Sequence, residues 1–301
     1  MDSLHEQLVI LISTPLYVAV ILGEIILSHY RRSNSYTLRD TLTNLYLMLL
    51  NSGVDLAFRL VYLVIFHWFW VHRLYEFTTP IWYWFWLVVG MDFLYYWLHR
   101  VDHFNRFFWA VHVTHHSSEQ YNLTVGFRSS VFQPLYRFVY FIPLAVMGFN
   151  PLDILFIFAA TQIWGILVHT EHVRKLGWLE YILVTPSHHR VHHASNPLYL
   201  DKNLGMFLIV WDKWFGTFQP ELPDQAYQPL RYGLTKPLEK RDALNIVFHE
   251  WINIFRDLFG KKPLRSKFWY VFGPPGWSHD GSTLTSEQMR KKERQENIKA
   301  A

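Results

Sequence analysis

Histidine is concentrated in two short windows of this 301-residue chain. Of its 17 histidines, eleven lie within residues 99–116 and 169–193. An imidazole is costly to bury unless its nitrogens are used, so this clustering indicates a shared chemical task. Neutral imidazoles brought together present nitrogen lone pairs, which a divalent metal satisfies.

The spacing within each window is that of side chains on one helix face. Residues at i, i+3 and i+4 are neighbours on a helix surface, so the motifs predict imidazoles that converge on a common centre. The motifs are "HRVDH" with His99 and His103, "HVTHH" with His112, His115 and His116, and "HRVHH" with His189, His192 and His193.

The number of clustered histidines predicts two metal ions. One structural zinc takes four ligands, and eight or more histidines exceed that. The chain has no cysteine, so only nitrogen and oxygen ligands remain and disulfides, thiolate catalysis and iron–sulfur clusters are excluded. Nitrogen-rich ligation with open positions suits iron that binds oxygen.

Other polar residues lie beside these motifs. His169 and His188 are predicted as further ligands, whereas His172 has no ligand spacing and its role is left open. Asp102 lies next to His103, and Glu171 lies two residues after His169. They are the candidate catalytic residues, expected to orient neighbouring imidazoles.

Apolar segments of membrane length position these windows. About 20 apolar residues cross a bilayer as a helix, and Arg31 with Arg32 assigns the end of the first segment to the cytoplasm. Five crossings from the outside would then bring both His99 and His169 out on the cytoplasmic side. The predicted spans are 8–30, 41–71, 81–100, 131–147 and 151–169.

The rest of the chain has no convincing span. Residues 241–259 predict an amphipathic helix, and the polar tail from 285 is expected to be mobile. The predicted fold is all-α: a multi-pass membrane helical bundle with a cytoplasmic histidine-rich helical cap. It forms one domain, residues 1–301, with membrane helices in 1–170 and the cap in 171–301.

The composition agrees with a protein that is partly in a membrane. Hydrophobic residues make up 51% and charged residues 17%, where soluble domains have about 25% charged residues. The mean hydropathy of +0.05 requires that part of the chain lies in water. The net charge of +4 is small and unclustered, which argues against nucleic-acid binding.

The order H-x3-H, H-x2-HH, a lone histidine and H-x2-HH resembles the fatty acid hydroxylase, or sterol desaturase, superfamily. The segments "HHSSEQYNLTVGFR", "HTE", "TPSHHRVHH", "DKNLG", "WDKWFGTF" and "GPPGW" resemble its alkylglycerol monooxygenase branch. The resemblance implies a multi-pass membrane enzyme with a histidine-ligated di-iron centre facing the cytoplasm. It carries the eight motif histidines over as ligands and His169 as the lone one.

The resemblance also implies the chemistry. Members of the superfamily use O2 to hydroxylate or desaturate membrane lipids, and the branch cleaves ether lipids with tetrahydrobiopterin, a candidate cofactor here. The chain has no "HPGG" segment of a fused cytochrome b5. Electrons are therefore expected from a separate donor: a reductase, a cytochrome or a pterin. Hydroxylation, desaturation and ether cleavage all stay open.

Two non-enzymatic functions are the alternatives. A haem electron carrier needs single histidines facing each other from two spans, and a metal transporter needs polar groups at the bilayer midplane. The histidine doublets lie instead beyond the ends of the predicted spans. The pattern therefore favours a membrane-bound di-iron lipid oxygenase.

Overall fold

The protein is described here by a computed structural model, which covers residues 2–33 and 35–300. Within these residues the regular structure is helical, and in place of strands there are two isolated bridges, Leu183 with Leu208 and Ala194 with Tyr232. The α-helices are α1 Asp2–Arg31, α2 Leu38–Val71, α3 Pro80–Phe104, α4 Arg106–His116, α5 Pro134–Val146, α6 Pro151–Leu167, α7 Pro186–His193, α8 Val210–Phe215, α9 Ala243–Phe259, α10 Leu264–Phe272 and α11 Ser286–Ala300; short 3-10 helices are η1 Leu123–Phe127, η2 Gly177–Tyr181 and η3 Pro197–Tyr199.

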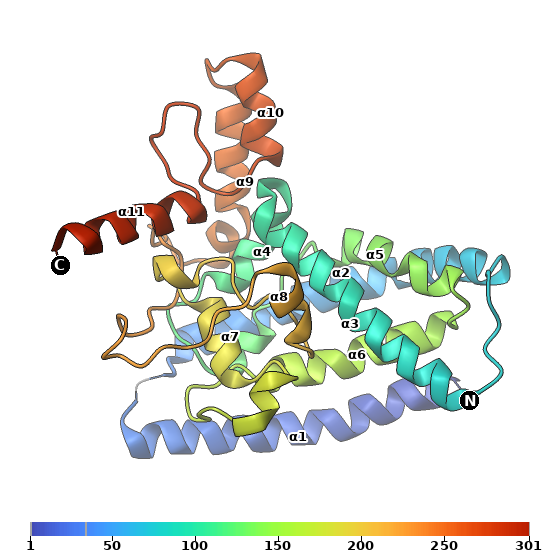
Figure 1. Cartoon of the computed structure of the whole chain (residues 1–301). Helices are drawn as coiled ribbons and strands as arrows, with labels where there is room; N and C mark the ends of the chain where they lie inside the picture. Colours follow the sequence, from blue (N-terminus) through green and yellow to red (C-terminus); the bar gives the residue numbers. More distant parts are fainter. Residues whose placement is uncertain (1, 34, 301) are drawn as a thin grey trace.

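The five predicted apolar segments all form helices, α1, α2, α3, α5 and α6, which run lengthwise through the molecule (Figure 1). Four of them share one apolar core, to which α2 gives Phe66, α3 gives Met91, α5 gives Leu144 and α6 gives Ile154. Each of these side chains is almost completely buried. The core fixes α3, which ends with His99 and His103, and α6, which ends two residues before His169.

α2 has the properties of a membrane-spanning helix. It is 34 residues long, its most apolar stretch has a mean hydropathy of 1.6, and 11% of that stretch is buried. The core helix of a soluble protein would bury most of such a stretch. Among the described residues, α2 is the one helix that is both long enough and apolar enough to cross a membrane, while α5 and α6 are apolar but shorter. The multi-pass topology therefore stays a prediction.

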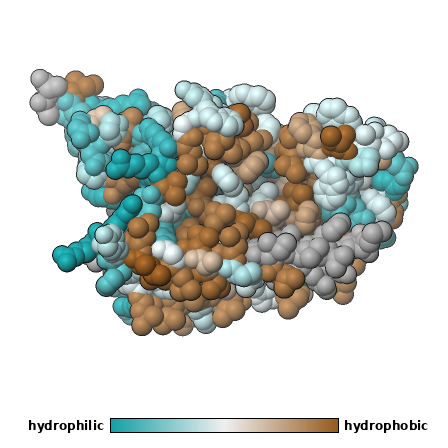
Figure 2. Space-filling model, turned by 90° about the horizontal axis from the view of Figure 1, so that it is seen from below, coloured by the Kyte–Doolittle hydropathy of each residue, from teal (hydrophilic) through white to brown (hydrophobic). Residues whose placement is uncertain are grey.

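Surface polarity is unevenly distributed. Seen from below, hydrophilic residues gather mainly at the left end, and hydrophobic residues extend across the middle (Figure 2). The left end is where α11 lies in Figure 1. The bundle helices leave large apolar side chains exposed, among them Ile26 on α1 and Leu56 and Leu60 on α2.

A bend at Asn105 separates α3 from α4. Asn105 has an extended backbone, with φ −127° and ψ 121°, and its side chain accepts the Phe107 N–H at 3.0 Å. One residue thus ends the first helix and caps the second. The bend turns α4 back, so that its histidines face those at the end of α3.

The segment around α8 is fastened to the bundle by a buried carboxylate. Asp92 on α3 accepts the backbone N–H groups of Phe207 and Leu208 and the Trp211 indole N–H. Its exposed fraction is 0%, so these donors supply the hydrogen bonds that a buried carboxylate requires. Asp92 therefore holds the segment 207–211, which follows α7, against the middle of α3.

The polar tail is a helix rather than a mobile segment. α11 covers Ser286–Ala300, and Arg290 donates to the Leu200 carbonyl while Glu293 accepts from the Tyr227 hydroxyl. The expectation of a mobile tail was wrong because "TSEQ" forms a capping box. Thr285 N–H donates to Gln288 Oε1 at 2.8 Å, and Gln288 N–H returns to Thr285 Oγ1.

Candidate metal centre

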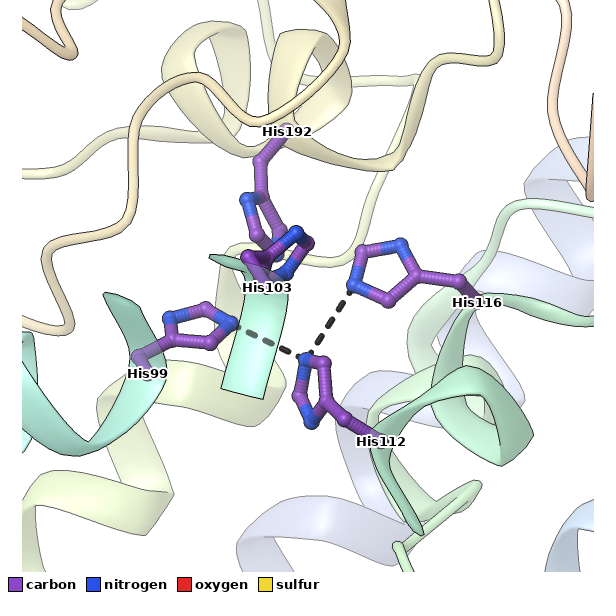
Figure 3. A group of neighbouring side chains, drawn as sticks. All are labelled: His99, His103, His112, His116 and His192. Atoms are coloured by element: carbon purple, nitrogen blue, oxygen red, sulfur yellow. Dashed lines mark hydrogen bonds between the residues drawn. The ribbon is translucent and has the colours of Figure 1, made fainter. Parts of the chain in front are cut away.

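Nine histidines from three parts of the chain come together in two groups. Within each group the candidate ligand nitrogens all lie within 4.8 Å of one another. Figure 3 shows the rings of the first group turned toward a common point. The first group is His99, His103, His112, His116 and His192, and the second group is His115, His169, His189 and His193.

Each H-x2-HH motif is divided between the two groups. On α4, His112 and His116 join the first group while His115 joins the second, and α7 sends His192 to the first group and His189 with His193 to the second. Residues at i and i+4 lie nearly in line on a helix, whereas adjacent residues point about 100° apart. The expectation of one common centre is therefore refined to two adjacent ones.

The two groups touch. The His116 ring of the first group stacks on the His193 ring of the second with centroids 4.5 Å apart, and the His192 ring of the first stacks on the His189 ring of the second at 5.1 Å. α4 and α7 face each other across this contact. The arrangement suits a pair of ions held side by side.

Backbone carbonyls fix the orientation of four rings. The Nδ1 atoms of His99, His115, His169 and His192 lie 2.7, 3.0, 2.6 and 3.0 Å from the carbonyl oxygens of Leu204, Arg128, Gly165 and Lys202. A carbonyl oxygen only accepts, so Nδ1 carries the proton in each ring. In the neutral ring, Nε2 is then left with a lone pair for a ligand.

The Nε2 atoms lie closer together than the protons of neutral rings can satisfy. His112 Nε2 lies 3.1 Å from His99 Nε2 and 3.2 Å from His116 Nε2, and a single ring proton can satisfy only one of these contacts. Buried Nε2 atoms of His103 and His192 have no hydrogen-bond partner. Unpaired buried lone pairs are destabilising, and a metal ion at the centre of each group satisfies them together. The residues present therefore fit a metal.

Burial keeps these imidazoles neutral. Desolvation lowers the pKa of His115 to about 4 and brings the pKa values of His112, His116, His189, His192 and His193 well below their ordinary value. Repulsion from neighbouring imidazoles acts in the same direction at each of these rings. Neutral rings have free lone pairs at neutral pH, as metal ligation requires.

A loop after η3, residues 201–205, orients three of the five rings in the first group. Asp201 Oδ1 lies 3.1 Å from His103 Nδ1, and the Lys202 and Leu204 carbonyls hold His192 and His99. Asp201 and Asn203 adopt positive φ, 54° and 53°, a conformation that Asp and Asn tolerate better than most residues. Sequence reasoning missed this loop as a source of ring contacts, although "DKNLG" contained both residues.

Replacing Asp201 with alanine is expected to lower metal affinity or turnover roughly 10–100-fold, because the His103 ring loses the partner that orients it. Competition with a chromogenic chelator measures the affinity. Asp201→Asn keeps an acceptor oxygen and should lie close to wild type. An unchanged affinity in Asp201→Ala would show that the loop carboxylate does not orient the ring.

The two candidate catalytic acids lie in different surroundings. Asp102 is completely buried, accepts from Gln133 and Tyr136, and lies 3.7 Å from His112 Nδ1. Burial raises its pKa to about 7. It therefore faces His112, on the next helix, rather than the adjacent His103.

Glu171 does not orient His169. It is exposed and accepts from the Ser35 hydroxyl, whereas the Gly165 carbonyl holds the His169 ring. A catalytic role for Glu171 stays a prediction.

His188 lies outside both groups. Its Nδ1 accepts the Thr185 N–H at 3.4 Å, and its Nε2 lies 3.4 Å from Glu180. These contacts make it the capping partner of Thr185 at the start of α7. His188 thus supports the helix that carries the second window, and the geometry gives it no direct contact with either group.

Gly126 on η1 marks a close approach to the second group. A Cβ atom there would lie 2.9 Å from Ile166 Cα and 3.2 Å from His169 Nδ1. Gly126→Ala is expected to displace His169 and to cost about 1–3 kcal/mol of stability through overpacking. Bound metal should fall while Gly53→Ala, on α2 where a Cβ meets nothing within 4 Å, retains it. Equal metal content in the two variants, by elemental analysis, would contradict this.

The stretch from α3 to α8 contains both groups and the loop that orients them. Residues 84–217 match the fatty acid hydroxylase family. This part of the chain belongs to that family. The matched residues include all nine grouped histidines together with Asp102, Asp201 and Asp212.

Similarity to individual proteins extends beyond residues 84–217. The chain is 36% identical over 270 residues to human alkylglycerol monooxygenase, covering 88% of this chain and 59% of the relative. It is 34% identical over 278 residues to the Xenopus tropicalis enzyme of the same name, covering 88% and 58%. The chain thus spans about three fifths of the length of these alkylglycerol monooxygenases.

More distant relatives have related names. An ornithine lipid hydroxylase of Rhizobium tropici is 32% identical over 183 residues, covering 59% of this chain and 54% of the relative. A Delta(7)-sterol 5(6)-desaturase of Gibberella zeae is 27% identical over 177 residues, covering 53% and 51%. These names describe oxidoreductases that act on lipids. No solved structure matches the chain.

Proposed function

We propose that this chain is a membrane-bound di-iron oxygenase that uses O2 to attack a C–H bond of a lipid. The observation that carries the proposal is the pair of histidine groups at the end of an apolar helical bundle. Five and four imidazoles exceed what one structural ion takes, and iron held by imidazoles would supply the activation of O2. The similarity to alkylglycerol monooxygenases, a lipid hydroxylase and a sterol desaturase supports the lipid as substrate.

The protein's own contribution is orientation and exclusion of water. Carbonyls of Leu204 and Lys202 and the Asp201 carboxylate hold ring protons on Nδ1, so that the Nε2 atoms face inward. All nine grouped histidines except His115 are buried, which limits access of bulk water. A lipid chain would reach this end of the bundle laterally from the bilayer along α2, α3 and α6.

The proposed topology places the histidine groups on the cytoplasmic side of the membrane. The membrane-length α2 and the Arg31–Arg32 pair after α1 support it. Further crossings by α1, α3, α5 and α6 belong to the proposal. The cap, residues 171–301, would then lie in the cytoplasm.

A cavity beside the second group suits a small polar electron donor. It has a volume of about 720 Å³ and is lined by Glu119, Tyr121, Glu171 and Tyr232, among others. The Tyr121 ring stacks on Tyr232 with centroids 4.6 Å apart and lies 5.7 Å from the His169 ring. Gln120 Oε1 and the Tyr232 hydroxyl are buried and unpartnered. Tetrahydrobiopterin is the candidate reductant for this cavity, and a separate reductase or cytochrome is the alternative.

Isotopically labelled O2 tests the proposal and identifies the reaction. Iron-loaded protein in lipid nanodiscs is supplied with alkyl and acyl lipids and with each class of reductant in turn, and lipid products are analysed by mass spectrometry. Hydroxylation adds labelled oxygen to the lipid, desaturation removes two hydrogens without adding oxygen, and ether cleavage releases a fatty aldehyde. If no lipid changes with any reductant while iron is bound, the proposed function is wrong.

A further inference from the structure

α9 and α10 form a helical hairpin that exposes a continuous series of large apolar side chains. Phe259 at the end of α9 is 79% exposed, and Leu264 at the start of α10 is 84% exposed. On α9, exposed residues recur at nearly every turn, which is the pattern of a single helix face. They are Leu244, Phe248, Ile252, Phe255 and Phe259, and α10 adds Leu264, Phe268, Trp269 and Phe272.

This exposed series is separate from the side of the hairpin that packs on the protein. Ile246 and Val247 of α9 are buried against Leu47 of α2. Arg106, at the start of α4, donates to Glu250 and Asp257 of α9, each at 2.6 Å. The hairpin therefore already has a buried face, and its outward apolar series is not required by the core.

The tip of the hairpin is basic. Residues 260–267, "GKKPLRSK", contain four basic residues and no acidic one. Lys261 and Arg265 are exposed, while Lys262 pairs with Asp257 at 2.6 Å. Exposed cations beside Phe259 and Leu264 combine apolar insertion with attraction to anionic headgroups, as in helices that lie in a membrane interface.

The position of the hairpin agrees with a location in the membrane interface. Figure 1 shows α9 and α10 projecting from the body across the direction of α1 and α6, beside α4 at the histidine end of the bundle. If the bundle crosses a bilayer, helices in that direction run along the membrane surface. A hairpin with an apolar face and a basic tip in this position is suited to contact with the lipid–water interface of the membrane.

We infer that the α9–α10 hairpin lies in the headgroup and upper acyl region of the leaflet on the histidine side. The apolar series of α9 and the tip residues contact acyl chains, and Lys261 and Arg265 contact anionic headgroups. The inference rests on the membrane topology of the proposed function and adds a second attachment to it. Through Arg106, this attachment would be fastened to the helix that supplies three of the grouped histidines.

The absence of cysteine from the chain allows a test with single spin labels. Phe255→Cys and Leu264→Cys report on the hairpin, Leu60→Cys on α2 reports on the bilayer, and Lys291→Cys on α11 reports on water. Each full-length variant is reconstituted into bilayers that contain anionic lipid. Electron paramagnetic resonance then compares collisions with O2, which partitions into lipid, and with a water-soluble nickel chelate.

We expect the ratio of O2 to nickel accessibility at 255 and 264 to be several-fold higher than at 291, as it is at 60. If the labels at positions 255 and 264 have the low ratio of the label at position 291, while the label at position 60 has the high ratio of a lipid environment, the hairpin inference alone is overturned. A label at 60 that behaves as in water would instead overturn the proposed membrane topology. Dipolar broadening at 255 that disappears on dilution with unlabelled protein would assign the face to a second copy, which also overturns the inference.

The contribution of the basic tip is tested separately. In bilayers of zwitterionic lipid alone, the label at 264 should move toward water, because the attraction of Lys261 and Arg265 to anionic headgroups is lost. The double variant Lys261→Gln, Arg265→Gln in anionic bilayers should give the same shift. If the accessibility ratio at position 264 is the same after both changes, these cations do not have the proposed role.

Discussion

Alanine at His169 should abolish turnover and reduce bound iron, while alanine at His172 should leave most activity. His169 Nε2 lies 3.1 Å from His193 Nε2 and 3.0 Å from His189 Nε2 at the centre of the second group. Its removal leaves a gap in a buried set of ligands. His172, three residues later, belongs to neither group, so it is a matched control on the same segment.

His188→Ala should fall between these two. It loses the capping contact at the start of α7 but no grouped nitrogen, so a cost of about 1 kcal/mol in stability and a partial loss of turnover are expected. Turnover assays and iron analysis on the three variants give the order. A dead His172→Ala beside a His169→Ala protein that keeps its iron and its turnover would show that the second group is wrongly assigned.

Asp212→Ala should remove metal from the first group without touching a histidine. Asp212 is completely buried and accepts the backbone N–H groups of Leu204 and Gly205 and the Thr217 hydroxyl, at 2.7, 2.8 and 2.6 Å. Leaving buried donors unpaired costs about 1–3 kcal/mol each, so a total loss of about 3–5 kcal/mol is expected. The loop that orients His99, His103 and His192 would then lose its anchor.

Thermal unfolding followed by tryptophan fluorescence, together with iron analysis, measures both effects. Asp224→Ala is the matched control, because Asp224 is an exposed acid in the same cap. It should retain wild-type stability and iron. If Asp212→Ala unfolds at the wild-type temperature with its iron intact, the 201–205 loop does not determine the first group.

The sequence contains local patterns, and these predicted the helices well. Apolar length predicted α2, and amphipathic periodicity predicted α9, Ala243–Phe259, within two residues at its start. The histidine spacing, with the lone His169 of the resemblance, identified all nine residues that form the two groups. These predictions succeed because helical periodicity and ligand type are properties of neighbouring residues.

What the sequence did not predict depends on contacts between distant segments. His115 and His116 point to different sides of α4, but the partners that each one meets depend on α7, whose histidines contact both α4 and the end of α3. The groups that orient the rings are mostly backbone carbonyls, such as those of Leu204 and Gly165. Any residue type has a carbonyl, so composition and spacing cannot identify them.

Acidic partners were misplaced for a similar reason. Adjacency in sequence suggested that Asp102 serves His103 and Glu171 serves His169. On a helix, adjacent side chains point about 100° apart, and the nearest histidine to Asp102 in an ion-pair contact is His112 on the next helix. Asp201, 98 residues beyond His103, supplies the carboxylate that His103 contacts.

The metal content of the purified protein tests the central claim most directly. Protein loaded with iron in detergent or nanodiscs, then freed of excess iron, is analysed for metal per chain. We expect about two iron ions per chain in the wild type, held by the five and four imidazoles of the two groups, and a lower content in both His103→Ala and His189→Ala. One ion or none per chain in the saturated wild type would contradict the account.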